Sequence, residues 1–301
     1  MANDLPKAGR MASVKANDKP IFKYLRIDTK GETVAQADFE LAKNKVGIPY
    51  MLSLIPATDA NDLTTYLVGY GNPDFLGMGN KEMAASFAAS HGGRLPRMTN
   101  MTGNKLNTVI MGKFADNKLA YLKTMTPQQF WAKGVTPAGS KVAIPDEKNA
   151  GKFFLSGLAF IDAGEMNGKN YLVATSWGSK KVFAIQSDAG GNIEKVYVPH
   201  SGKVEYQEGV IFPKGNGDLI MLFTHQPKAK DDGERKEKNE ERSIEACIIS
   251  PSKGTVSAPK SLLPSKHYVD LVDPIRALGN GEVLILGHSS RKDLTLSKVK
   301  W

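Results

Sequence analysis

Short runs of apolar residues, separated by turns rich in Gly and Asn, recur along this chain of 301 residues. In the clearest copy, a short apolar run at 156–161 is followed by a turn at 167–170 and a longer apolar run at 171–177. A second copy occupies 208–225. Asn and Gly tolerate the positive φ of tight hairpin turns, so Asn-Gly between two apolar runs predicts a β-hairpin. The pattern therefore predicts a chain made largely of antiparallel hairpins.

The same pattern occurs three more times, at 48–70, 95–113 and 273–288, with unequal spacing. A repeat of roughly 40–50 residues built from four short strands is typical of a β-propeller blade. The chain resembles the β-propeller class in this repeat pattern, and we recognise no specific family in it. We expect an all-β fold, a β-propeller of about five four-stranded blades. The alternatives are six blades, with 20–47 as a blade of its own, and a β-sandwich.

The two ends of the chain are expected to close the ring. Residues 21–36 have the pattern of an outer hairpin with no inner hairpin before it. The last copy lacks part of its outer half, because the chain stops just after 294–299. We therefore predict that N-terminal strand residues complete the C-terminal blade, which removes the exposed edges that an open sheet presents.

Three segments differ in composition from the repeats. Residues 1–19 carry scattered Lys and Arg among small polar residues and are predicted to form a flexible basic arm before a single propeller domain at 20–301. Residues 226–242 carry many charges of both signs and no large apolar residue, so they are predicted to form a mobile insertion. The Ala-rich stretch 81–90 predicts a short helix.

Charge and cysteine content narrow the function classes. The net charge is +9 and the pI about 9.3, which favours solubility and steering of anions rather than a particular ligand. The sequence shows no Arg/Lys-rich helix or aromatic-studded strand of the RNA-binding kind, which argues against a nucleic-acid partner. The single cysteine, Cys247, lies in an apolar run and is expected to be a buried strand residue.

No targeting or membrane signal is visible. The N-terminal residues contain no apolar signal region, and no run approaches about 18 apolar residues. We expect a soluble protein without a membrane span, synthesised in the cytoplasm without a signal peptide.

Known catalytic and cofactor motifs do not occur. We find no Gly-rich phosphate loop, no metal-ligand spacing of Cys and His and no nucleophile elbow, so we predict neither a cofactor nor a metal. The stretch 187–191 is similar to the Asp-box turn of sialidase-like propellers, but the aromatic residue that should follow is missing. We therefore interpret it as an ordinary turn.

The propeller hypothesis predicts where a site would lie. In propellers the first strand of each blade starts, and the second ends, at the face where ligands usually bind. Two carboxylates, Glu208 and Asp273, open first strands in this arrangement. The residues expected to bind a ligand at the same mouth are Tyr70, Arg97, Lys113, Trp177, His225, Arg276 and His288. Such a mixture of charges and aromatic rings suits a polar ligand, although ion pairs between the carboxylates and Arg97 or Arg276 would have the same pattern.

Two classes of function fit these features. Because catalytic motifs do not occur, we expect a non-enzymatic binding or structural platform that contacts protein partners or a glycan within a larger assembly, with a viral or extracellular particle as the setting. The alternative is a hydrolase acting on a glycan, with Glu208 and Asp273 as acid and nucleophile or base. A retaining pair needs carboxyl groups about 5–5.5 Å apart, and an inverting pair about 6.5–9.5 Å.

Overall fold

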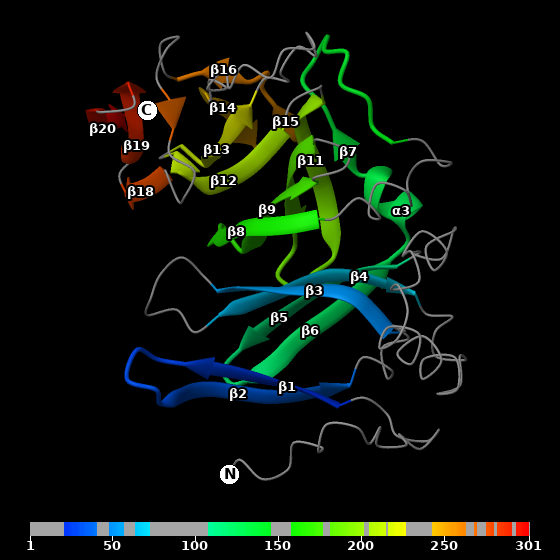
Figure 1. Ribbon diagram of the computed structural model, residues 1–301. Coiled ribbons are helices and arrows are strands. Elements are labelled where there is room, and N and C mark those ends of the chain that lie inside the picture. Colours follow the sequence, from blue (N-terminus) through cyan, green and yellow to red (C-terminus); the bar gives the residue numbers. More distant parts are fainter. Residues whose placement is uncertain are drawn as a thin grey trace, which may run out of the picture.

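The computed structural model describes residues 21–40, 48–56, 64–72, 108–145, 158–176, 181–201, 205–214, 216–226, 243–262, 268–269, 275–279, 282–290 and 293–300. These residues are nearly all in antiparallel strands, and the one helix among them is the short α3 (Pro127–Trp131) (Figure 1). The expected all-β class is therefore confirmed. No helix in this described part is long and apolar enough to span a membrane.

An N-terminal hairpin precedes the larger sheets. It consists of β1 (Ile21–Ile27) and β2 (Thr33–Glu40), which pair with each other. The next sheet, called sheet I, has the strand order β3-β4-β5-β6 and consists of β3 (Ile48–Pro56), β4 (Thr65–Asn72), β5 (Thr108–Ala115) and β6 (Lys118–Met125).

Three further sheets follow in chain order. Sheet II contains β8 (Leu158–Met166), β9 (Lys169–Ser176), β10 (Lys181–Ser187) and β11 (Ile193–Ser201), with β7 (Gly134–Val135) parallel to β11 at its edge. Sheet III contains β12 (Glu205–Lys214), β13 (Asp218–Gln226), β14 (Ser243–Ser250), β15 (Thr255–Val256) and β16 (Lys260–Ser261). Sheet IV contains β17 (Tyr268–Val269), β18 (Ile275–Gly279), β19 (Glu282–Ser290) and β20 (Asp293–Lys300).

Consecutive sheets pack face to face, and their first strands lie against each other in the order β3, β8, β12 and β18 (Figure 1). One apolar core fills each junction. Leu172 of β9 belongs to the core between sheets I and II, while Val173 beside it belongs to the core between sheets II and III. Successive strand side chains point to opposite faces, so a sheet covered on both faces needs consecutive apolar residues. This requirement explains the unbroken apolar runs in the sequence, and the arrangement is that of propeller blades.

The structure corrects the expected second repeat. Residues 108–113 were expected to form the second strand of a separate blade, but β5 pairs with β4 and is the third strand of sheet I, where Met111 lies opposite Val68. Residues 95–101, expected as the first strand of that blade, lie outside the described residues. A count of five blades remains a prediction.

The structure also corrects the expected closure. Among the described strands, β20 pairs with β19 alone, and β1 and β2 pair only with each other. The N-terminal hairpin buries Tyr24, Ala35 and Ala37 against sheet I instead. The ring of Tyr24 stacks on that of Phe114 with 4.2 Å between centroids, and its hydroxyl lies 2.6 Å from Oγ1 of Thr65. Apolar packing thus holds this hairpin on sheet I rather than beside β20.

The remaining expected segments fall mostly outside the described residues. This holds for the basic arm at 1–19, the helix at 81–90 and residues 227–242 of the charged insertion. Cys247 is buried in β14 as expected, and burial raises the pKa of its thiol. Helix α3 begins with a capping box between Thr126 and Gln129 and buries Phe130 and Trp131 against Phe183 of sheet II.

Candidate functional site

Most residues of the predicted mouth can be placed on strands. Tyr70, His225 and His288 lie toward the ends of β4, β13 and β19, the second strands of their sheets. Glu208 lies near the start of β12, and Arg276 is the second residue of β18. The contact between β12 and β18 brings these two strands together. Arg97, Trp177 and Asp273 lie outside the described residues, as do the side chains of the five residues placed here.

Glu208 lies in a β-bulge. Tyr206 pairs with His225 and Gly209 pairs with Phe223, so two residues of β12, Gln207 and Glu208, face the single residue Thr224 of β13. A bulge bends its strand and changes the direction of the side chains that it carries, and bulges are frequent beside active sites. The bulge therefore marks the part of β12 that carries the predicted carboxylate.

Each of the four first strands that the structure describes has one such extra residue relative to its second strand. The shifts occur at Pro49/Met51 in β3, Phe160/Asp162 in β8 and Ala277/Gly279 in β18. The residues inserted at these points are Tyr50, Ile161 and Leu278, none of which is acidic. A bulge is thus common to the first strands, whereas a carboxylate within the bulge is particular to β12.

Lys113 does not belong to the predicted mouth. In the β4–β5 ladder, Tyr70 pairs with Val109 and Lys113 pairs with Tyr66, which places Lys113 at the opposite end of sheet I from Tyr70. The expectation followed from treating β5 as a second strand. As a third strand, β5 is antiparallel to β4. Its first residues therefore lie at the end of the sheet where the mouth was predicted, and its last residues lie at the opposite end.

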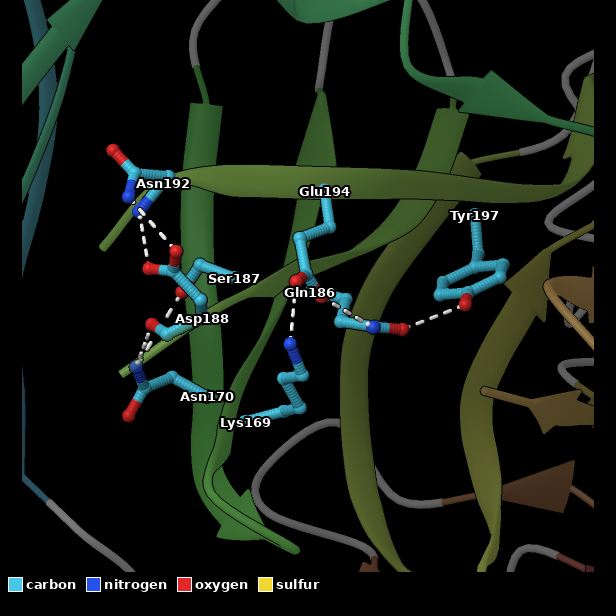
Figure 2. Close-up of polar contacts among 8 residues, drawn as sticks. All are labelled: Lys169, Asn170, Gln186, Ser187, Asp188, Asn192, Glu194 and Tyr197. Atoms are coloured by element: carbon cyan, nitrogen blue, oxygen red, sulfur yellow. Dashed lines mark hydrogen bonds and ion pairs between the residues drawn. The ribbon is translucent and has the colours of Figure 1, made fainter. Parts of the chain in front are cut away.

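Lys113 instead belongs to a polar network between sheets I and II that centres on Asn170. Nζ of Lys113 donates to Oε2 of Glu165 at 2.9 Å and to Oδ1 of Asn170 at 3.3 Å. Oδ1 of Asn170 also accepts a hydrogen bond from the Tyr66 hydroxyl at 3.2 Å. Nδ2 of Asn170 donates to the carbonyl oxygen of Asp188 at 2.8 Å (Figure 2). The buried amide of Asn170 thus joins groups from β4, β5 and the turn after β10.

The turn that accepts this bond is itself tightly bonded. Oδ1 of Asp188 accepts from the backbone N of Asn192, and Oδ2 accepts from the side-chain Nδ2 of the same residue, both at 2.8 Å. These bonds to Asn192 favour the charged carboxylate and hold the pKa of Asp188 below its ordinary value. Tyr121 of β6 packs on this turn, and burial raises the pKa of its hydroxyl to about 12.

A second polar network lies on the other face of sheet II. Glu194 forms an ion pair with Lys169 and accepts from Nε2 of Gln186 at 2.8 Å. The Tyr197 hydroxyl donates to Oε1 of Gln186 at 2.7 Å (Figure 2). The bond from Lys169 is the main reason that the pKa of Glu194 is lowered. Burial raises the pKa of Tyr197, so its hydroxyl keeps its proton.

The first network joins sheets I and II, and the second joins three neighbouring strands of sheet II, so both suit structural contacts better than a catalytic site. A glycosidase needs a carboxylic acid whose pKa is raised so that it holds a proton. The pKa values of Asp188 and Glu194 are both lowered, and the carboxylates are already bonded to neighbouring side chains. Among the residues that the structure describes, no group of three His, Cys, Asp or Glu side chains is arranged to hold a metal ion.

Neither network was predicted from the sequence. Asn170 appeared there only as the last residue of a turn, and Asp188 only in the stretch that is similar to an Asp-box. Nothing in the local sequence separates a buried Asn from an exposed turn residue. Asn170 is bonded by Tyr66 and Lys113, and both of these residues come from a different sheet.

Comparison with known proteins returned solved structures only. No family model and no curated protein matches the sequence. A GH32 beta-fructofuranosidase from Bombyx mori is similar over 80% of this chain and 43% of its own, with 14% identity and a TM-score of 0.32. A mutant apocarotenoid oxygenase from Synechocystis is similar over 92% of this chain and 53% of its own, with 12% identity and a TM-score of 0.38.

A third similar structure is a polysaccharide lyase of the PL25 family, an ulvan lyase. It is similar over 83% of this chain and 55% of its own, with 9% identity and a TM-score of 0.43. This chain spans about half the length of these structures. All three are enzymes, and the names of two are those of glycan-acting enzymes, which contradicts the expectation of a non-enzymatic platform in an assembly. We correct that expectation here.

Proposed function

We propose that the protein is a hydrolase that acts on a glycan, with Glu208 and Asp273 as its two carboxylates. The observation that carries the proposal is the bulge at Gln207–Glu208, opposite Thr224. It is the one first-strand bulge, among those described, that contains an acidic residue. In the sequence, Asp273 stands two residues before β18, and β18 contacts the strand that carries Glu208.

The proposed chemistry needs two carboxyl groups with different roles. One protonates the oxygen of the leaving sugar, and the other attacks the anomeric carbon or activates a water molecule. His225 pairs through its backbone with Tyr206, two residues from Glu208, so it belongs to the same end of sheet III. We assign substrate contacts to the other mouth residues, with Tyr70 and Trp177 as stacking surfaces for sugar rings.

The test measures release of new reducing ends by the full-length protein from a panel of oligosaccharides and polysaccharides. We expect Glu208→Gln and Asp273→Asn each to lower turnover on the order of 10²-fold or more, because neither carboxyl can fill the other's role. Circular dichroism and thermal unfolding verify that both variants keep the fold. The anomer of the first product distinguishes retention from inversion.

Glu165→Gln provides a matched control. Glu165 is a strand carboxylate whose ion pair with Lys113 lies at the end of the sheets away from the predicted mouth. This variant should lose that ion pair and keep its activity. Absence of turnover by the wild-type chain across the panel, or full activity in both carboxamide variants, would exclude the proposal.

A further inference from the structure

The N-terminal hairpin repeats the outer hairpin of sheet II in detail. In the turn after β1, the backbone N of Asp28 donates to the carbonyl of Glu32 at 2.9 Å, and Oδ1 of Asp28 accepts from N of Glu32 at 2.9 Å. In the turn after β10, Asp188 makes the same two bonds with Asn192, at 3.0 and 2.8 Å. The third residue after each Asp is a glycine with positive φ.

The strand pairing next to the turn is also the same in the two hairpins. Ile27 pairs with Thr33, and the next residue of β2, Val34, is an extra residue in the ladder. Ser187 pairs with Ile193, and Glu194 is the extra residue of β11. The N-terminal hairpin is therefore equivalent to β10–β11, the third and fourth strands of the antiparallel part of sheet II.

This equivalence extends to packing. Tyr24 of β1 corresponds to Ala184 of β10, and each is buried against the sheet that follows, sheet I for Tyr24 and sheet III for Ala184. The next residues, Leu25 and Ile185, point to the opposite face. Ile185 is fully buried against the preceding sheet, whereas Leu25 is 46% exposed. The hairpin thus carries a face suited to a preceding sheet, and on that face Ile27 is also exposed, at 58%.

Sheet IV has a complementary face with exposed apolar residues. Val283 and Ile285 of β19 face sheet III and are buried. On β20, Leu296 pairs with Leu286 on the other face, and Leu294 and Leu296 are 76% and 63% exposed. Four of the six large apolar side chains that are exposed among the described residues therefore lie on the two terminal faces.

We propose that these two faces bind each other between two copies of this chain. We define the hairpin face by Leu25 and Ile27 and the β20 face by Leu294 and Leu296. They are the two halves of a sheet-on-sheet contact that the chain already makes between each pair of neighbouring sheets. One chain carries both halves at opposite ends of its row of sheets (Figure 1), so a second copy supplies the partner for each.

Such a contact joins different surfaces of the two copies. A head-to-tail contact of this kind forms a closed assembly when its rotation closes, and two copies can close through two identical contacts. Exposed apolar strands left unpaired would promote aggregation, which gives the contact a stabilising role. The proposal is independent of the hydrolase activity, because neither face includes a residue of the predicted mouth.

The first experiment measures the mass of the full-length protein by sedimentation over a concentration series. The wild type should associate reversibly, and Ile27→Lys or Leu296→Glu should each raise the dissociation constant at least about tenfold. Mixing the two variants should restore partial association, because one contact in a mixed pair has two wild-type faces. Leu54→Glu is the matched control, since Leu54 is exposed on β3 outside both faces.

Cysteine cross-linking provides a second measurement that does not depend on affinity. The natural Cys247 is buried, so introduced cysteines are the reactive ones. Ile27→Cys mixed with Leu296→Cys should give a cross-linked pair of chains, whereas Leu54→Cys with either should not. A protein that stays monomeric and gives no cross-link between chains would overturn the proposal, as would an Ile27→Cys/Leu296→Cys double variant that links only within one chain.

Discussion

Asn170 shows how one buried polar side chain can hold two sheets together. Its amide bonds to the Asp188 carbonyl on one side and to Tyr66 and Lys113 on the other. Buried polar groups are costly when unpaired, so these hydrogen bonds favour the arrangement in which sheets I and II meet at the amide. The apolar core between sheets I and II holds them together, and the polar network fixes how the two sheets align.

We predict that Asn170→Leu destabilises the protein by about 1–3 kcal/mol, because the substitution keeps the approximate volume but removes the hydrogen bonds that the buried amide makes to Tyr66, Lys113 and Asp188. The free energy of unfolding, measured by denaturant titration, tests this. Asn216→Ala is the control, since Asn216 is exposed and its side chain bonds locally to Asp218. An equal effect of the two substitutions would show that the network contributes nothing.

At the scale of elements, the turn at 188–192 has two roles. It connects β10 to β11 and provides the surface on which Tyr121 of sheet I rests. Gly191 has a φ of +82°, and a Cβ placed there would lie 2.2 Å from the Tyr121 ring. The equivalent Gly31 has a φ of +87°, and a Cβ placed there would meet nothing within 4 Å. The two glycines therefore share a conformation and differ in their surroundings.

This pair predicts a measurable difference in stability. Gly31→Ala should cost about 1–2 kcal/mol, because an L-residue is strained in the left-handed region. Gly191→Ala should cost about 1–3 kcal/mol more, because Tyr121 must also move. Denaturant titration of both variants checks this prediction. Equal losses of stability would mean that the Tyr121 ring moves aside at no cost in free energy, so that its close contact with Gly191 does not contribute to stability.

At the scale of the whole molecule, the described part of the chain is a row of sheets that begins with a two-stranded hairpin. The N-terminal hairpin has the turn, ladder and buried face of an outer blade half. Its attachment to sheet I depends strongly on Tyr24, which combines ring stacking on Phe114 with a hydrogen bond to Thr65. Loss of this attachment would expose Ile110 and Leu67, which are buried beneath the hairpin.

Substitutions at Tyr24 separate the two contributions. Tyr24→Phe should cost about 0.5–1.5 kcal/mol through the lost hydrogen bond, and Tyr24→Ala about 3–5 kcal/mol through the lost packing as well. Leu25→Ala, on the opposite face of the same strand, is the control and should change the stability of the monomer little. Hydrogen exchange of β1 and β2 would show whether the hairpin detaches locally. Comparable losses for Tyr24→Ala and Leu25→Ala would refute the docking.

The sequence by itself determined the class of fold and many of the strands. Asn-Gly turns and apolar runs are local signals, so the hairpins at 158–176 and 205–226 were predicted close to their observed positions. The strand β12 begins at Glu205, three residues before the start that was expected at Glu208.

Only the tertiary structure decided which strands pair across long intervals and which side chains meet. A long segment, 73–107, separates β4 from β5, so local signals assigned β5 to a blade of its own and placed Lys113 at the wrong end of sheet I. The docking of the N-terminal hairpin on sheet I and the burial of Asn170 likewise depend on partners distant in sequence. Local patterns specify φ, ψ and the side that faces a core, whereas the identity of the covering surface is settled only when the whole chain packs.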